Sequence, residues 1–270
     1  RNIVDAVGYI LSGQGMGLGA VGVQDERIYA AREFKKADDR PGNYKATGGH
    51  GGILGTVGPP VTVWYRPAYR RSSTSDVNIN KLPTELAFLD HFGDSATVTL
   101  RVKDGDGALL GNSIPRVHIV KYGAYMEEDE TRDPDDEVDI IARIQLAQSQ
   151  QSKPQGEAPQ LHGIVLEGTS PYGMGSSSQH AALAIATFSG MPVVRVGRAD
   201  PGGRVPSDGR DSLSIAGSNL DTNKARLLLM ASLMKLGRLP KAQNPRNPTV
   251  DERKAVQAKL AKYQEIFENH

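Results

Sequence analysis

Apolar residues recur with different spacings along the chain, and the pattern changes near residue 115. Before it, short alternating runs surround turn residues, as at 21–30, where a turn at 24–26 predicts a β-hairpin. After it, strand-like and helix-like segments alternate, which predicts a parallel sheet with right-handed crossovers. The sequence therefore predicts an α/β fold whose compact domain occupies 115–270.

The first 114 residues predict fewer regular elements. Apolar positions at 2–11 fall on one helical face, and β-branched and aromatic residues at 61–67 predict a strand. Residues 98, 100 and 102 alternate before the turn residues Asp104 to Gly107, which indicates a second hairpin. Asp104 and Asp106 also resemble a calcium loop, but the EF-hand spacing and its final glutamate are absent.

The segment 115–270 carries clear start signals for its helices. Asp133 before Pro134 suits the start of a helix, and Thr249 with Glu252 forms a capping-box pattern. The predicted strands and helices, in chain order, are strand 116–123, helix 133–148, strand 163–166, helix 177–189, strand 192–196, helix 222–237 and a last helix from 249.

Composition narrows the class of protein. Hydrophobic residues make up 38% of the 270 and charged residues 23%, with a formal net charge of +1, so nothing indicates a nucleic-acid partner. Cysteine is absent, which excludes disulfides and thiolate chemistry within this chain. No apolar run approaches the roughly 20 residues of a membrane span, so we expect a soluble protein without a membrane partner, either cytoplasmic or secreted.

Three sequence patterns are candidates for a cofactor, catalytic or metal site, and each lacks a feature that such a site requires. The glycines at 17–22 fit G-x-G-x-x-G, but a helix precedes them and a strand follows, which argues against a dinucleotide site. Ser176 and His180 are spaced to meet on a helix, yet no G-x-S-x-G elbow exists and helix capping explains the serine better. The histidines show no metal-ligand spacing, so we expect no metal.

The loop that follows the apolar run at 164–166 is the best candidate for a functional site. Ligands of open parallel sheets bind beyond the carboxyl ends of the strands, where residues 167–175 are expected. The helix after it has N–H groups that can receive an anion. The alternative is that the loop only connects a strand to a helix.

Several motifs, in order, resemble bacterial-type L-asparaginases. These are "GIVLEGTSPYGMG", "GMPVVRVGRADPGGRV" and "AGSNLDTNKARLLLMASL", with "NIVDAV", "IYAAREFKKAD" and "PRVHIVKYGAYMEED" before them. The first group is similar to the C-terminal domain of that family, and the second to the later part of its N-terminal domain. The resemblance covers most of 1–83 and 115–270.

The resemblance implies a two-domain, parallel-sheet asparaginase-like architecture and an amidohydrolase that releases ammonia from L-asparagine or L-glutamine. A threonine would attack the amide carbon of this small-molecule amide substrate without any metal or organic cofactor. The family forms homodimers or homotetramers, with each site between two subunits. The resemblance places five residues beside the substrate across such an interface: Gly168, Thr169, Tyr172, Gly173 and Ser176.

The chain also departs from the family pattern. The "T-G-G-T-I" and "G-T-D-T" segments that carry the catalytic threonines are not found, so no catalytic residue is assigned. Gly173 stands where a substrate-contacting asparagine is usual. We therefore expect 1–114 to be an incomplete N-terminal domain, with a possible insertion at 84–114, and the chain by itself to be inactive.

Two other interpretations stay open. The chain is alternatively a non-catalytic binding or assembly protein that retains the dimerising C-terminal domain. It is otherwise an unrelated doubly wound domain with a ligand at the same strand ends.

Overall fold

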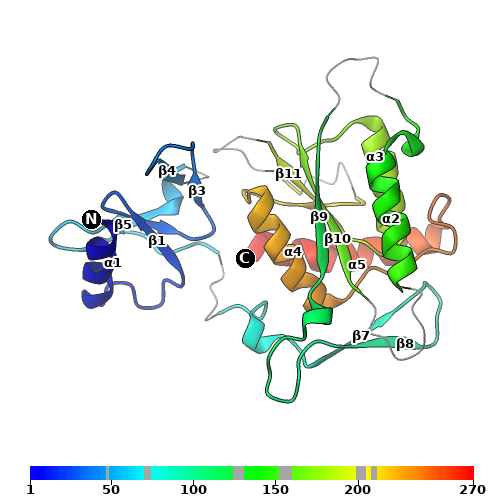
Figure 1. Ribbon diagram of the computed structural model, residues 1–270, viewed down its shortest axis with the longest axis horizontal. Helices are drawn as coiled ribbons and strands as arrows, with labels where there is room; N and C mark the ends of the chain where they lie inside the picture. Colours follow the sequence, from blue (N-terminus) through cyan, green and yellow to red (C-terminus); the bar gives the residue numbers. More distant parts are fainter. Residues whose placement is uncertain (47–48, 70–73, 124–130, 152–159, 199–204, 208–211) are drawn as a thin grey trace.

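The structure, a computed structural model, shows a small N-terminal β-rich part beside a larger α/β part (Figure 1). It describes residues 1–46, 49–69, 74–123, 131–151, 160–198, 205–207 and 212–270.

The larger part is built on a four-stranded sheet in which all neighbouring strands are parallel. Its order is β12-β11-β10-β9. The strands are β9 (Arg116–Lys121), β10 (His162–Gly168), β11 (Val193–Gly197) and β12 (Ile215–Ala216). The parallel α/β fold predicted from the sequence is confirmed.

Helices cover both faces of this sheet (Figure 1). They are α2 (Val138–Gln151), α3 (Ser177–Phe188), α4 (Thr222–Leu236) and α5 (Val250–Asn269). Ile164 and Leu166 of β10 pack in a cluster with α2 and α3, whereas Val165 packs with α4 and α5. A strand buried on both faces reads as a continuous apolar run, which explains the sequence at 164–166. No helix in the described ranges is both long enough and apolar enough to cross a membrane.

The predicted helix starts are confirmed, with one difference. Thr249 and Glu252 form the expected capping box at α5. Asp133 accepts a hydrogen bond from the Asp135 N–H, but the turn that it caps is a 3-10 helix, and α2 begins only at Val138. Glu137 interrupts the helix at this point because its backbone leaves the helical region, with φ −86° and ψ 61°.

The N-terminal part contains a second sheet, of order β1-β2-β5-β6. Its elements are α1 (Asn2–Leu11), β1 (Val21–Gln24), β2 (Arg27–Ala30), β5 (Ile53–Thr56) and β6 (Thr62–Val63), with a separate pair β3 (Phe34–Lys36) and β4 (Tyr44–Ala46). The hairpin predicted at 21–30 is confirmed, with Val23 opposite Ile28. Asp25 and Glu26 have φ of 51° and 61°, as a type I′ turn requires.

Two apolar segments of the N-terminal part are only partly covered by its core. The strand predicted at 61–67 ends at Val63, because the N–H groups of Trp64 and Tyr65 both turn to the carbonyl of Leu54. On α1, Ile3 and Leu11 are about four-fifths exposed, at 81% and 80%, and Tyr9 is the residue that is buried. The apolar face of α1 is therefore presented to solvent.

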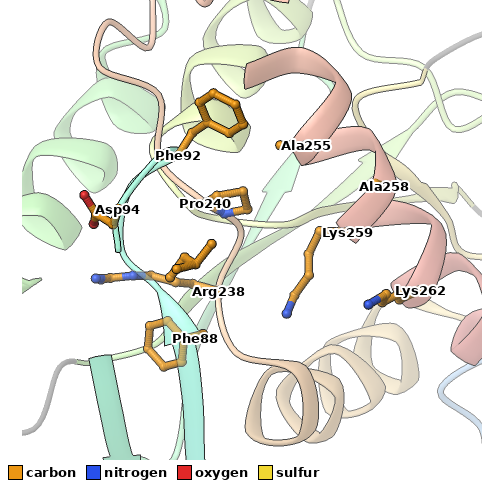
Figure 2. Close-up of a pocket in the computed structure, with 11 residues that line it drawn as sticks. Phe88, Phe92, Asp94, Arg238, Pro240, Ala255, Ala258, Lys259 and Lys262 are labelled. Carbon is orange, nitrogen blue, oxygen red and sulfur yellow. The ribbon is translucent and has the colours of Figure 1, made fainter. Parts of the chain in front are cut away.

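A two-stranded hairpin lies between the two parts of the sequence. It consists of β7 (Glu85–Leu89) and β8 (Thr97–Arg101), with Leu86 opposite Leu100. The predicted turn at Asp104 is present, since the Asp104 carboxylate accepts the N–H groups of Asp106 and Ala108. The hairpin predicted around this turn is wrong, because the strand before the turn pairs with β7, and past the turn the described residues form an isolated bridge between Lys103 and Leu109. The inward side chains of β7 and β8 join the main core, and Phe88 lines a pocket with α5 (Figure 2). The segment 84–114, expected as a possible insertion, is thus part of the main core.

A buried histidine at the start of β10 makes folding depend on pH. Neither ring nitrogen of His162 has a hydrogen-bond partner among the described residues. Burial, together with smaller contributions from the positive charges of His118 and Arg116, lowers its pKa to about 4. In an unfolded chain the pKa of histidine is about 6.5, so the unfolded state binds more protons between these values.

We therefore predict that His162 lowers the free energy of unfolding by about 3 kcal/mol as the pH falls from above 6.5 to 4. The leucine variant His162→Leu should lose this part of the pH dependence, measured by urea unfolding at a series of pH values. The surface variant His91→Leu is the control and should retain it. Identical pH profiles for both variants would contradict the assignment.

Candidate functional site

The loop that follows β10 lies at the carboxyl end of the parallel sheet, where the sequence placed it. It turns back on itself: the Thr169 N–H donates to the carbonyl of Met174 at 2.8 Å, and the Gly173 N–H donates to the carbonyl of Thr169 at 2.7 Å. The loop then enters α3 through Ser176. Its first residues and its last therefore sit close together at the edge of the sheet.

Two glycines allow this tight turn. A Cβ atom on Gly168 would lie 2.3 Å from the carbonyl carbon of Gly173, so a side chain at 168 would push the two sides of the loop apart. Gly173 has φ +65°, and its Cβ would lie 3.0 Å from the carbonyl oxygen of Val196. Both positions therefore favour glycine for local reasons.

The side chain of Arg195 on β11 anchors the loop through hydrogen bonds. Its side chain is buried, although its neighbours along the strand are valines. The Nη1 atom donates to the carbonyl of Tyr172 at 2.5 Å and lies 3.4 Å from the Met174 sulfur, and Nε donates to the Ser214 hydroxyl at 2.6 Å. One guanidinium thus joins the loop, β11 and the segment that precedes β12.

Ser176 has a structural role at the start of α3. Its Oγ accepts the N–H of Gln179 at 3.1 Å and donates to the Glu137 carboxylate at 3.3 Å. Ser178 donates to the same carboxylate at 2.6 Å. The His180 ring instead accepts the Gly175 N–H at 3.1 Å. Helix capping is therefore confirmed as the role of Ser176. The side chains of Ser176 and His180, which are spaced to meet on a helix, do not bond to each other.

Fewer residues of the loop are accessible to a ligand than the sequence indicated. Gly168, Gly173 and Ser176 are buried, Thr169 is exposed and Tyr172 is half-buried. The N–H groups at 173, 175 and 176 already donate within the loop or to α3. These N–H groups are therefore not available to an anion, and the expectation that the first turn of α3 itself, which begins at Ser177, receives one stays a prediction. The exposed side chains of the loop are those of Thr169, Ser170 and Pro171, and the half-buried side chain of Tyr172 lies beside them.

A crevice of about 500 Å³ lies beside the loop, between β3, the ends of β9 and β10, and the start of α4. Lysines and acids share its lining, namely Lys35, Lys36, Lys121, Lys224, Glu167 and Asp221. Burial lowers the pKa of Lys224, whose ammonium donates to the carbonyl of Arg32 at 2.9 Å. Glu167 accepts the Thr222 hydroxyl at 2.8 Å. The bond from Lys224 to Arg32 attaches the N-terminal part to the rim of the sheet, whereas the bond between Glu167 and Thr222 lies within the larger part.

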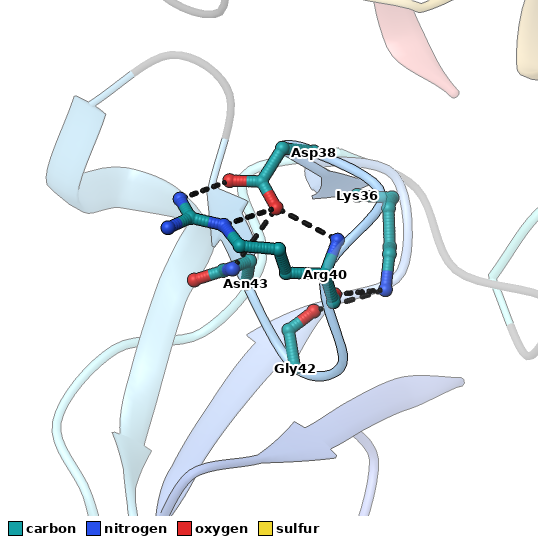
Figure 3. Close-up of polar contacts among 5 residues, drawn as sticks. All are labelled: Lys36, Asp38, Arg40, Gly42 and Asn43. Atoms are coloured by element: carbon teal, nitrogen blue, oxygen red, sulfur yellow. Dashed lines mark hydrogen bonds and ion pairs between the residues drawn. The ribbon is translucent and has the colours of Figure 1, made fainter.

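The turn between β3 and β4 orients one lysine of that crevice (Figure 3). The Lys36 ammonium donates to the carbonyls of Arg40 and Gly42, at 2.8 and 3.2 Å. The Asp38 carboxylate accepts hydrogen bonds from the side chain of Arg40, from the backbone N–H of Arg40 and from the side chain of Asn43. These hydrogen bonds lower the pKa of Asp38 to about 2. Lys36 is therefore occupied in stabilising its own turn.

Sequence reasoning missed Glu137 and Arg195 as supports of the loop. The signal for Arg195 was an arginine within an otherwise apolar strand. Nothing in the sequence connects Glu137 with Ser176 and Ser178, which follow it by 39 and 41 residues. Within the described ranges, no group of three or more histidine, aspartate or glutamate side chains is placed to hold a metal ion.

The comparisons with known proteins establish the fold. No protein-family model matches the chain, and no curated protein matches it in sequence. Among solved structures it is similar to a protein described as a probable cytoplasmic L-asparaginase from Campylobacter jejuni, with a TM-score of 0.63 and 18% identity. The match covers 100% of this chain and 65% of that one, so the chain spans about two thirds of its length. The chain has an asparaginase-like α/β fold.

We predict that Gly173→Asn destabilises the protein by about 1–3 kcal/mol, because the added side chain meets the backbone of Val196 at a buried position. Gly107→Asn is the matched control: its φ is +82°, and a Cβ there meets nothing within 4 Å. Urea unfolding should show a loss for the first variant and little change for the second. Equal unfolding free energies would contradict the close approach of Gly173 to β11.

Proposed function

We propose that the chain is the C-terminal-domain region, with part of the N-terminal domain, of an asparaginase-like amidohydrolase. The observation that carries this proposal is the fold likeness, which extends over the whole chain. The ordered sequence motifs support it independently. The substrate would be the side-chain amide of asparagine or glutamine.

The position of the loop supports a substrate-facing role. Thr169 is exposed at the carboxyl edge of the sheet, and Tyr172 lies half-buried beside it. In the proposed assembly these two side chains reach the cleft of a second copy, so the working unit is a homodimer or a larger homo-oligomer. Gly168, Gly173 and Ser176 act there by shaping the loop.

The proposed chemistry needs a nucleophile that the loop does not provide. A threonine oxygen attacks the amide carbon, the amide nitrogen gains the threonine proton and leaves as ammonia when the C–N bond breaks, and water then hydrolyses the resulting ester. The Thr169 hydroxyl donates to the Met174 carbonyl, which is no base, and the buried Ser176 caps a helix. We infer that the attacking threonine belongs to segments that this chain does not contain.

A non-catalytic assembly protein is the second candidate. The exposed apolar face of α1 favours it, because such a face on a helix marks a contact surface. An assembly protein would need neither a nucleophile nor an amide-binding cleft.

We predict that this chain by itself releases no ammonia from asparagine or glutamine above the buffer rate, because the sequence motifs that carry the catalytic threonines of the family are not found in it. A form of the protein that also carries the "T-G-G-T" and "T-D-T" segments should be active. In that form, Thr169→Val should lower kcat/KM by about tenfold or more. Thr99→Val, at an exposed site on β8, is the control and should leave kcat/KM unchanged.

Mixed oligomers separate the two candidates. Chains with Thr169→Val, combined with chains that lack the attacking threonine, should regain activity if each site draws on two copies. Turnover by the present chain, or full activity of Thr169→Val, would contradict the proposal. An inactive extended form with intact oligomers would favour the assembly protein.

A further inference from the structure

A pocket of about 360 Å³ lies at the edge of the sheet opposite the loop, where the parallel strands begin. It is enclosed by β7 with the residues after it, by the segment after α4, and by α5. Its volume falls within the range of small-molecule sites. Figure 2 shows Phe88, Arg238 and Pro240 on one side and Ala258, Lys259 and Lys262 from α5 on the other.

The walls of the pocket are mainly apolar. Phe88 and Phe92 supply two aromatic rings, and Pro240, Ala255 and Ala258 supply small aliphatic surfaces. Phe92 remains 37% exposed, so part of an apolar wall is open to water. Covering this surface with the apolar body of a ligand is favourable.

Positive charge is in excess around these walls. Arg238 is 2% exposed and uses Nη2 on Asp90, while its Nε and Nη1 have no hydrogen-bond partner among the described residues. Its guanidinium also lies 5.2 Å from the Phe88 ring centre. A buried guanidinium with unused donors is costly unless a hydrogen-bond acceptor reaches it.

Two lysines of α5 add to this excess. The Lys259 ammonium donates to the carbonyl of Leu236, and burial together with the positive charge of Lys262 lowers its pKa to about 8. No carboxylate forms an ion pair with Lys259 or Lys262 in the part of the chain that the structure describes. Asp94 is the acid that the described lining contributes. An anion would therefore be attracted to this wall.

We propose that this pocket binds a small organic carboxylate with an aromatic or other apolar body. The apolar body lies between Phe92 and the alanines of α5, and the carboxylate faces Lys259 and Lys262 of α5. The site is distinct from the loop at the carboxyl edge and does not depend on the proposed amidohydrolase function. Formation of the pocket requires the segment 84–114, which gives that segment a binding role.

Phenylacetate is a suitable probe because it combines a ring with one carboxylate. Methyl NMR on alanine-labelled protein reports directly on Ala255 and Ala258. We expect their signals to shift with a Kd on the order of 1 mM or tighter, while Ala182 and Ala186 in α3 stay unshifted. Phenylacetamide lacks the charge and acetate lacks the ring, so both should bind at least about tenfold more weakly.

Three lysine variants test the charged wall. Lys262→Met alters an exposed side chain, and Lys259→Met keeps the length of the side chain but removes its ammonium; each should weaken phenylacetate about fivefold or more. Lys254→Met, on the same helix outside the pocket, should not weaken it. Melting temperatures check that all three variants fold. Unshifted Ala255 and Ala258 at 20-fold the expected Kd, about 20 mM, would overturn the proposal. Equal binding of phenylacetamide, or equal effects of Lys262→Met and Lys254→Met, would also overturn it.

Discussion

The arrangement at the carboxyl edge of the sheet depends on one buried arginine. A guanidinium among valines is unfavourable unless its donors find acceptors, and Arg195 finds them in the Tyr172 carbonyl and the Ser214 hydroxyl. Those partners come from two segments that are distant in sequence from each other. The need to satisfy one buried charge therefore fixes where the loop after β10 can lie, and brings the residues before β12 to the same place.

Two further contacts complete this arrangement. The Glu137 carboxylate accepts hydrogen bonds from the hydroxyls of Ser176 and Ser178, and these bonds place the start of α3 against the turn before α2. Because Gly168 has no side chain, the backbone of residues 173 and 174 can pass close to it. Several N–H groups of the loop donate within it or to α3, and the side chains of Thr169 and Tyr172 lie at its surface. A loop whose backbone is held by internal hydrogen bonds loses less entropy on binding, which supports the proposed role of the loop in a neighbour's cleft.

The sequence predicted the larger domain well because local signals and the buried pattern agree there. Apolar runs at 164–166 and capping residues at 176 and 249 were sufficient to locate β10, α3 and α5. It predicted the site less well, since the loop is positioned by contacts of long sequence separation, such as Glu137 with Ser178. Periodicity also could not say whether the apolar face of α1 is covered, because a pattern defines a face and not its partner.

Amide hydrogen exchange at Gly173 tests the role of Arg195 most directly. The Gly173 N–H donates to Thr169 only while the loop is closed. In Arg195→Met the Gly173 amide should exchange about 30-fold faster, whereas amides within β10 keep their protection. In Arg116→Met, which removes an exposed arginine from the same sheet, Gly173 should exchange as in the unchanged protein. Unaltered exchange of Gly173 in Arg195→Met would contradict the account.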